Sequence, residues 1–186
     1  MFNAGYLTIK KEISQQVYVL KFPNNETEQV MINYFLKLTF RNNFEIISWK
    51  KISKKIMDGI FRIDKEKIKD GTESLIYEIS ANIPYDWINK NPEGWLKTML
   101  GIAIKMNDVY YIGENQNIIG RTDLHIPKNN CVYVLELKVN EKAITCIKQI
   151  NEKYEPAYKN QFERIVKIGV NWDRKNKQVD VMVESI

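Results

Sequence analysis

Cysteine, histidine, proline and glycine are scarce in this chain of 186 residues, which has two Cys, one His, five Pro and eight Gly. Two cysteines cannot form a disulfide framework, and they favour a reducing compartment, here the cytoplasm. A single histidine excludes metal sites built from clustered histidines, and with the two cysteines it does not complete a tetrahedral zinc site without further ligands. No run of about eighteen apolar residues and no signal-peptide pattern occurs, so we expect neither membrane insertion nor secretion.

The balance of charge is moderately basic, with 28 Lys and Arg residues against 23 Asp and Glu residues and a net charge of +5. This balance is compatible with a nucleic-acid partner, and equally with a surface that is simply rich in lysine. Hydrophobic residues make up 44% of the chain and charged residues 27%, which is typical of a soluble globular protein. Lysines in residues 50–69, with Trp49 and Phe61 beside them, could contact phosphates, although a solvated helix face explains them slightly better.

The first half of the chain has the pattern of a hairpin followed by helices. Two alternating apolar runs separated by a polar turn predict a β-hairpin over residues 6–22, and helical spacing follows Asn24. Residues 42–63 also have helical spacing but few clear caps. A further helix is predicted over residues 66–82.

The second half changes from helical to strand-like periodicity. Asn91, Pro92 and Glu93 mark a strong helix start, because Asn is a good N-cap, Pro fits the first helical position and an acid suits the first turn. The elements predicted after this helix are strands near 110–112, 118–119, 124–126 and 132–139, a helix capped by Asn140, and strands over 164–172 and 179–184. The four strand-like runs before the second helix are interpreted as three strands, so the order is helix, three strands, helix, two strands.

A tight turn between two of these strands sets their register. Asn129 and Asn130 are candidates for a type I′ turn, because Asn tolerates positive φ. That turn pairs Lys128 with Cys131, and the rest of the antiparallel ladder follows from this pair. Pro127 weakens the prediction, since it cannot donate a hydrogen bond to the ladder.

The same register places Asp123 opposite Glu136, with Lys138 two residues further along the same face. Opposed carboxylates destabilise a strand pair, so a compensating cation is expected. Lys138 could supply the charge, and Mg2+ would supply it better, because this ion favours carboxylate oxygens, water and substrate phosphate. Such an ion activates water and stabilises developing charge, and a lysine can assist. The alternative is an exposed sheet end with an ordinary ion pair; His125, two residues from Asp123, is expected to be structural or solvent-facing.

The pattern of these residues resembles that of a known family. Asp123 followed after twelve residues by Glu136, Leu137 and Lys138 is similar to the PD-(D/E)xK nuclease signature, with Thr122 in place of the leading Pro. More specifically, the chain resembles the nuclease-like domain that follows predicted AAA-type ATPase domains in bacteria and archaea. The phrases that carry this resemblance are NAGYLTIK (3–10), YVLKFPNNETEQ (18–29), IPYDW (83–87), GRTD (120–123), YVLELK (133–138), KQI (148–150), YEPAY (154–158) and KIGVNW (167–172).

The resemblance implies an α+β (α/β) fold with a restriction-endonuclease-like α-β-β-β-α-β core, in which helices flank a mixed central sheet. Residues 85–186 would form the nuclease-like domain. Residues 1–84 would form an N-terminal β-hairpin and helical region, either the tail of an ATPase-associated domain or a linker. No G-x-x-x-x-G-K-[ST] motif occurs, so we expect no ATP-binding loop within this chain.

The resemblance also implies Mg2+-dependent cleavage of phosphodiester bonds, with Mn2+ as a substitute. Asp123 and Glu136 would be metal ligands, the Leu137 carbonyl would be a backbone ligand, and Lys138 would be the catalytic lysine. Gln149 matches a helix Gln found beside such sites, although an ordinary polar surface residue explains it equally well.

Glu93 could match an acid on the first core helix of some superfamily members, but its position in a first helical turn explains it better. The expected partners are nucleic acid, with DNA favoured over RNA, an AAA-type ATPase and a second copy of the chain. The alternative function is a catalytically inactive nuclease-fold module that binds nucleic acid or protein.

Overall fold

The structure is a computed structural model that describes residues 5–40, 46–117 and 120–186. The chain divides into two compact units, Met1–Phe44 and Glu45–Ile186. From the sequence we expected a boundary between residues 84 and 85. Two long helices before residue 85 instead pack within the second unit, because their apolar faces contribute to its core. The start of a nuclease-like domain at residue 85 stays a prediction.

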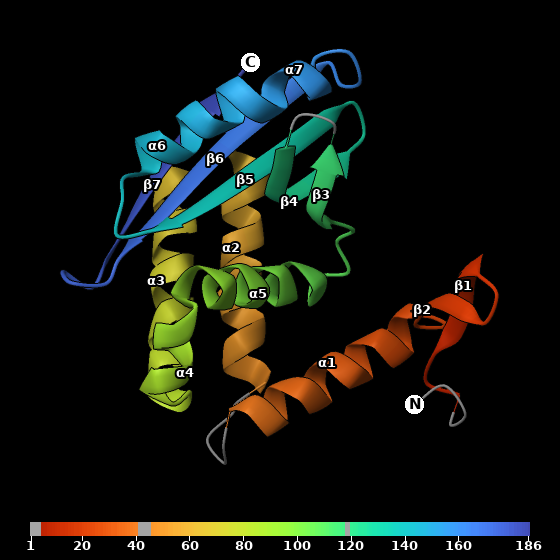
Figure 1. The fold of residues 1–186 in the computed structure, drawn as a ribbon. Coiled ribbons are helices and arrows are strands. Elements are labelled where there is room, and N and C mark those ends of the chain that lie inside the picture. Colours follow the sequence, from red (N-terminus) through yellow and green to blue (C-terminus); the bar gives the residue numbers. More distant parts are fainter. Residues whose placement is uncertain (1–4, 41–45, 118–119) are drawn as a thin grey trace. The chain divides into compact units, whose positions relative to one another are not determined.

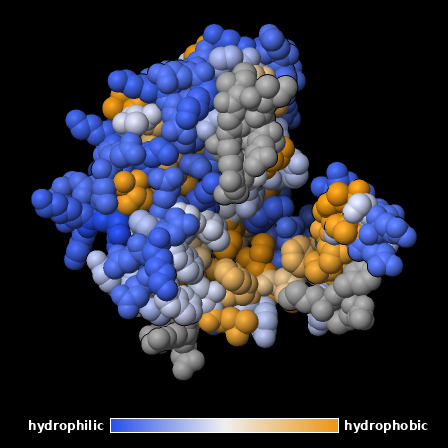
Figure 2. Space-filling view, in the orientation of Figure 1, coloured by the Kyte–Doolittle hydropathy of each residue, from blue (hydrophilic) through white to orange (hydrophobic). Residues whose placement is uncertain are grey.

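The first unit contains the expected hairpin and helix: β1 (Thr8–Ser14), β2 (Val17–Lys21) and α1 (Asn25–Thr39). Gln16 turns the hairpin with a φ of 65°, and the Asn24 side chain caps α1 by accepting a 2.8 Å hydrogen bond from the Thr27 backbone. Hydrophobic side chains lie on the surface of this unit, as Figure 2 shows for the hairpin. They include Ile13, Val17, Val30, Tyr34 and Leu38.

The second unit begins with α2 (Ile46–Arg62), α3 (Lys65–Asn82), α4 (Tyr85–Lys90) and α5 (Pro92–Lys105). The predicted start of α5 is confirmed, since the Asn91 side chain accepts a hydrogen bond of 2.9 Å from the Gly94 backbone. The helix expected over 66–82 is α3, whose first turn is capped by Asp64. The short helix α4 was not predicted, because six residues are too few to show a helical period.

A five-stranded sheet follows, with the order β3-β4-β5-β6-β7 (Figure 1). Its strands are β3 (Ile112–Asn117), β4 (Gly120–Lys128), β5 (Cys131–Val139), β6 (Arg164–Asp173) and β7 (Gln178–Ser185). The central pair β5 and β6 is parallel and the other pairs are antiparallel. The crossover between β5 and β6 consists of α6 (Ala143–Gln149), the π-helix η1 (Ile150–Tyr154) and α7 (Glu155–Tyr158). The predicted mixed sheet flanked by helices is confirmed.

Helices cover both faces of this sheet, so β5 and β6 are buried along most of their length. The crossover helices lie along one face, where Val132 and Val134 pack with Ile147, Ile150 and Tyr154. On the other face α3 packs against β7, and α5 packs against β4 and β5 (Figure 1). A charged residue near the end of β5 therefore lies between two helical layers.

Two details differ from the sequence expectations. Asn140 does not cap α6: it has a φ of 61°, and its side chain accepts a 3.0 Å hydrogen bond from the Arg174 backbone. The strand expected at 110–112 is shifted, since β3 starts only at Ile112, and the expected strand at 118–119 lies outside the described residues. In the described part of the chain, no helix has both the length and the apolar character needed to cross a membrane.

Candidate active site

The turn between β4 and β5 produces the predicted register. Lys128 pairs with Cys131 and Leu124 pairs with Leu135, and Pro127 causes no shift. The turn itself is not type I′, because that turn needs positive φ at both central residues and only Asn129, at 53°, has it. The register was thus correct although the turn type was wrong.

Asp123 lies one residue beyond the last pair of this ladder. Its side chain is largely buried, with 8% of the residue exposed, and its Oδ2 accepts a hydrogen bond of 2.9 Å from the Leu137 backbone N–H. The carboxylate therefore takes the place that a backbone carbonyl would take in a longer ladder. Its other oxygen, Oδ1, is 3.0 Å from the ammonium nitrogen of Lys97, which reaches over from α5.

Glu136 is the most buried acid of the site, with 1% of its surface exposed. Its Oε1 accepts a hydrogen bond from Gln149 Nε2. Its Oε2 is buried and has no hydrogen-bond partner among the described residues. Burial, with the added charge of Asp123, raises the pKa of Glu136 from 4.5 to about 8, against the opposing effect of Lys138. A bound cation or a proton would stabilise this buried carboxyl.

Lys138 lies between two acids. Its Nζ is 3.5 Å from Glu136 Oε1 and 3.7 Å from Glu93 Oε1, which belongs to the first turn of α5. Burial alone would lower the pKa of Lys138, but the charges of Glu136, Glu93 and Asp123 outweigh burial and raise it. Lys138 is therefore a stable cation at neutral pH. It suits charge stabilisation rather than proton abstraction.

Gln149, the last residue of α6, holds Glu136 from the opposite side. Its Nε2 donates to Glu136 Oε1 and also lies 3.1 Å from Tyr154 Oη, so both amide hydrogens have acceptors. Tyr154 comes from η1, where the helix widens into a π-helix. Such single-turn π-helices recur at functional sites. The structure brings Asp123, Glu136, Lys138 and Gln149 together, and their functional roles stay predictions.

Two neighbours of the site were missed in the sequence. Lys97 was not considered because a single lysine on an amphipathic helix is ordinary, yet it lies four residues after Glu93 and so shares its helix face. Tyr154 was not considered as a site residue. The i, i+4 spacing of Glu93 and Lys97 was the one available signal.

Other candidate groups lie elsewhere or are satisfied structurally. His125 is 4% exposed, its Nδ1 is 3.2 Å from Tyr158 Oη, and burial lowers its pKa, which fits the expected structural role. Burial raises the pKa of the Cys146 thiol to about 12, so this cysteine is not a thiolate near neutral pH. In the basic region Lys55 forms a 3.0 Å ion pair with Asp70.

The donor set fits a hard divalent cation. Asp123 and Glu136 offer carboxylate oxygens, and the unpartnered Glu136 Oε2 is available. Leu137, whose backbone N–H binds Asp123, follows Glu136 in the chain and has a backbone carbonyl. No group of three or more His, Cys, Asp and Glu side chains with metal-binding spacing occurs among the described residues. Mg2+ sites commonly have only one or two carboxylates and complete their shell with water and phosphate.

Comparison with known families points in the same direction. The model of the PD-(D/E)XK nuclease superfamily matches residues 91–181, from the cap of α5 into β7, which is just under half of the chain. The matched segment contains every residue of the site described above. Nucleases of this superfamily generally use divalent metal ions. No curated protein matches the chain significantly.

Proposed function

We propose that this protein is a metal-dependent nuclease that hydrolyses phosphodiester bonds in nucleic acid, DNA in preference to RNA. Asp123 and Glu136 would hold Mg2+ or Mn2+, with the Leu137 carbonyl as a further ligand. The observation that carries this proposal is the buried Glu136 carboxyl, which has one unpartnered oxygen beside a second acid and a permanent cation. The match to the nuclease superfamily supports the same assignment.

Each protein group has a distinct task in this proposal. A bound divalent ion would supply Lewis acidity toward the phosphate and a more acidic water. Lys138 stays protonated and offers positive charge to the phosphate oxygens as negative charge develops on them. Gln149 fixes the rotamer of Glu136, and Lys97 orients Asp123. The α5 residue Glu93 orients Lys138 from the other side.

One observation favours the alternative, a catalytically inactive nuclease-fold module. Both oxygens of Asp123 already have partners, Lys97 on one and the Leu137 backbone on the other. In an enzyme the Lys97 ammonium must yield at least part of its contact to the metal. In an inactive module the same ion pair would be permanent and would only stabilise the fold.

The deciding experiment is incubation with linear and branched DNA, and with RNA, in the presence of Mg2+ or Mn2+. Asp123→Ala and Lys138→Ala are the site variants, and the exposed residues Glu163 and Lys148, each replaced by Ala, provide matched charge controls. Metal-dependent cleavage that both controls retain and both site variants lose supports the nuclease. Absence of cleavage in the wild type, or equal cleavage in both site variants, rejects it.

Three finer assignments are also proposals. An AAA-type ATPase partner and a homodimer rest on the resemblance, and a cytoplasmic location rests on the scarcity of cysteine. Copurification with an ATPase, sedimentation analysis and cell fractionation would test them in turn.

A further inference from the structure

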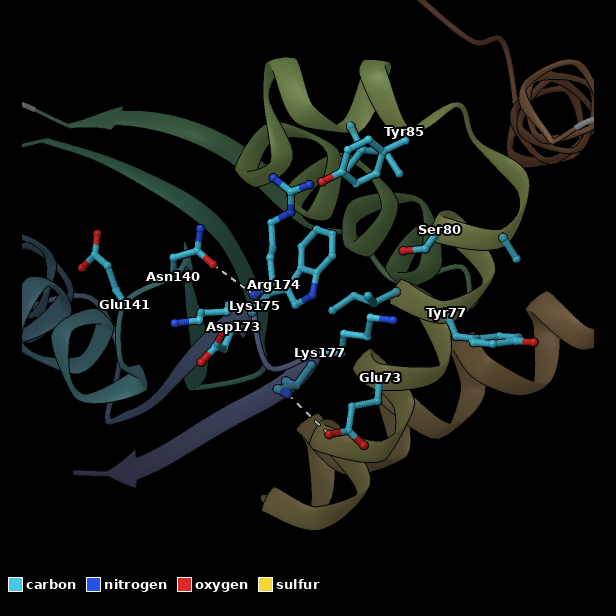
Figure 3. A pocket seen from close by; sticks show the side chains of 15 residues that line it. Glu73, Tyr77, Ser80, Tyr85, Asn140, Glu141, Asp173, Arg174, Lys175 and Lys177 are labelled. Carbon is cyan, nitrogen blue, oxygen red and sulfur yellow. Dashed lines mark hydrogen bonds between the residues drawn. The ribbon is translucent and has the colours of Figure 1, made fainter.

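An open pocket of about 1190 Å3 lies between α3, α4 and the turn that joins β6 to β7 (Figure 3). The nuclease proposal makes no use of it. Its lining combines aromatic side chains, among them Tyr85 and Trp172, with three basic residues of the turn, Arg174, Lys175 and Lys177. A pocket of this size can hold a nucleotide.

The aromatic part of the pocket is held in place by a single arginine. Tyr85 is 70% exposed, and the centre of its ring is 5.7 Å from the Arg174 guanidinium, which reaches toward it in Figure 3. The same guanidinium lies 5.4 Å from the ring of buried Trp172 and donates a hydrogen bond to Asn89 Oδ1. The Arg174 backbone N–H is bound by Asn140. An exposed ring fixed in this way is a platform on which a nucleobase can stack.

The charged part of the pocket leaves its cations available. In the described residues neither Lys175 nor Lys177 forms an ion pair, although three acids, Glu73, Glu141 and Asp173, also line the pocket. Glu73 Oε1 accepts a hydrogen bond of 3.4 Å from the Val179 backbone N–H. Both oxygens of Asp173 accept hydrogen bonds from Asn176, at 2.9 and 2.7 Å, and these bonds lower the pKa of Asp173. Glu141 lies at the end of the pocket opposite Tyr85 (Figure 3). The turn therefore presents positive charge that suits phosphate.

The pocket and the candidate active site share the junction between α4 and α5. Asn89 of α4 binds Arg174 in the pocket, and Glu93, four residues later, binds Lys138 in the site. On the sheet side, Asn140 lines the pocket and follows Lys138 by two residues. Four residues of chain span at most about 14 Å. A strand with one phosphate at Lys138 can therefore reach the pocket with a neighbouring nucleotide.

We infer that this pocket binds a nucleotide of a single-stranded segment of the nucleic-acid substrate, next to the phosphate held at the candidate active site. The base stacks on Tyr85, which Arg174 supports, and phosphates meet Lys175 and Lys177. A single strand is required because the bases of a duplex are stacked on one another and closed to protein aromatic rings. The inference rests on the proposed function for the identity of the ligand as substrate.

The test measures binding without cleavage. Fluorescence anisotropy of a labelled single-stranded DNA of about 12 nucleotides is recorded with the full chain in EDTA at low salt, beside a duplex of the same length. Tyr85→Ala should weaken single-strand binding about 5- to 100-fold, while duplex binding stays constant. Tyr85→Phe keeps the ring and should retain the affinity. The matched control is Tyr110→Ala, which removes a tyrosine of similar exposure outside the pocket.

The inference is overturned by an absence of single-strand binding in the wild type, by unchanged affinity in Tyr85→Ala, or by an equal loss for the duplex. Thymidine monophosphate is the competitor, and competition as strong as that of the unlabelled oligonucleotide would assign the pocket to free nucleotides and reject the strand. The nuclease proposal fails independently. If the protein cleaves nothing with metal but its single-strand affinity still depends on Tyr85, it is a single-strand binding module. If it cleaves with metal but its single-strand affinity does not depend on Tyr85, it is a nuclease without this subsite.

Discussion

Replacing Glu136 by Gln should stabilise the metal-free protein above neutral pH. The buried carboxyl has a pKa of about 8 in the folded state and 4.5 as its ordinary value. Each tenfold change in an acid dissociation constant corresponds to about 1.4 kcal/mol, so ionised Glu136 costs the fold up to about 5 kcal/mol. Typical domains are stable by about 5–15 kcal/mol, so this is a large fraction of the total.

The sign follows from proton binding. Between pH 4.5 and about 8 the folded state holds a proton on Glu136 that the unfolded state has lost, so the free energy of unfolding falls as pH rises through this window. Below pH 4.5 both states are protonated and the effect is absent. The side-chain amide that Glu136→Gln introduces cannot titrate, so the variant lacks this slope. The groups that interact with this carboxyl and remain in the variant are Asp123 of β4, Lys138 of β5, Cys146 and Gln149 of α6, and Tyr154 of η1. Two groups of α5 lie one contact further away: Glu93 pairs with Lys138, and Lys97 pairs with Asp123.

Urea unfolding in EDTA at about pH 5 and about pH 8.5, on either side of most of this window, measures the effect by tryptophan fluorescence. All four tryptophans belong to the second unit, so the signal reports the unit that contains the site. Glu93→Gln is the matched control, because this acid is 43% exposed and its replacement should leave the slope intact. A stability difference between wild type and Glu136→Gln that is the same at both pH values would refute the reasoning.

Three further results are expected at the same site. Lys97→Met should raise Mg2+ affinity about fivefold in calorimetric titration, because it removes a competing cation from Asp123; unchanged or weaker binding would show that the ion pair does not compete. Gln149→Ala should weaken metal binding by about 10- to 100-fold in the same assay, since it frees the rotamer of Glu136, while an unaltered Kd would make Gln149 a surface residue. Lys138→Met should lower cleavage at saturating metal by at least about 100-fold with little change in metal affinity, and a parallel loss of both would assign Lys138 to structure.

The sequence was most informative where a local backbone preference, such as a tight turn, also determined which distant residues lie side by side. The pairing of Lys128 with Cys131 follows from the two-residue turn, and it brings Asp123 beside the strand that carries Glu136. The start of α5 followed from three residues with strong positional preferences. These features depend on local backbone chemistry, which the sequence states directly.

Features that depend on tertiary packing were out of reach. Lys97 reaches Asp123 only because α5 packs across β4 and β5, and no local pattern reveals that crossing. Asn140 is a residue type that often caps helices, but its backbone adopts a positive φ. Its side-chain oxygen accepts a hydrogen bond from the Arg174 backbone in the turn after β6. The widening of the crossover helix into η1 has no sequence signature. The packing of α2 and α3 in the same unit as the sheet also depends on tertiary contacts.

Because α5 is a rigid helix, its packing in the core also determines the positions of its charged residues Glu93 and Lys97. Glu93 and Lys97 stand about 6 Å apart along one helix, at about 1.5 Å per residue, and each contacts a different strand. Leu96 lies between them and Met99 beyond them in the sequence, and both are buried in the core. A core substitution that rotated α5 would therefore move both charged groups together. Apolar substitutions on the buried side of this helix are therefore expected to change the positions of the two charged groups as well as the stability of the unit.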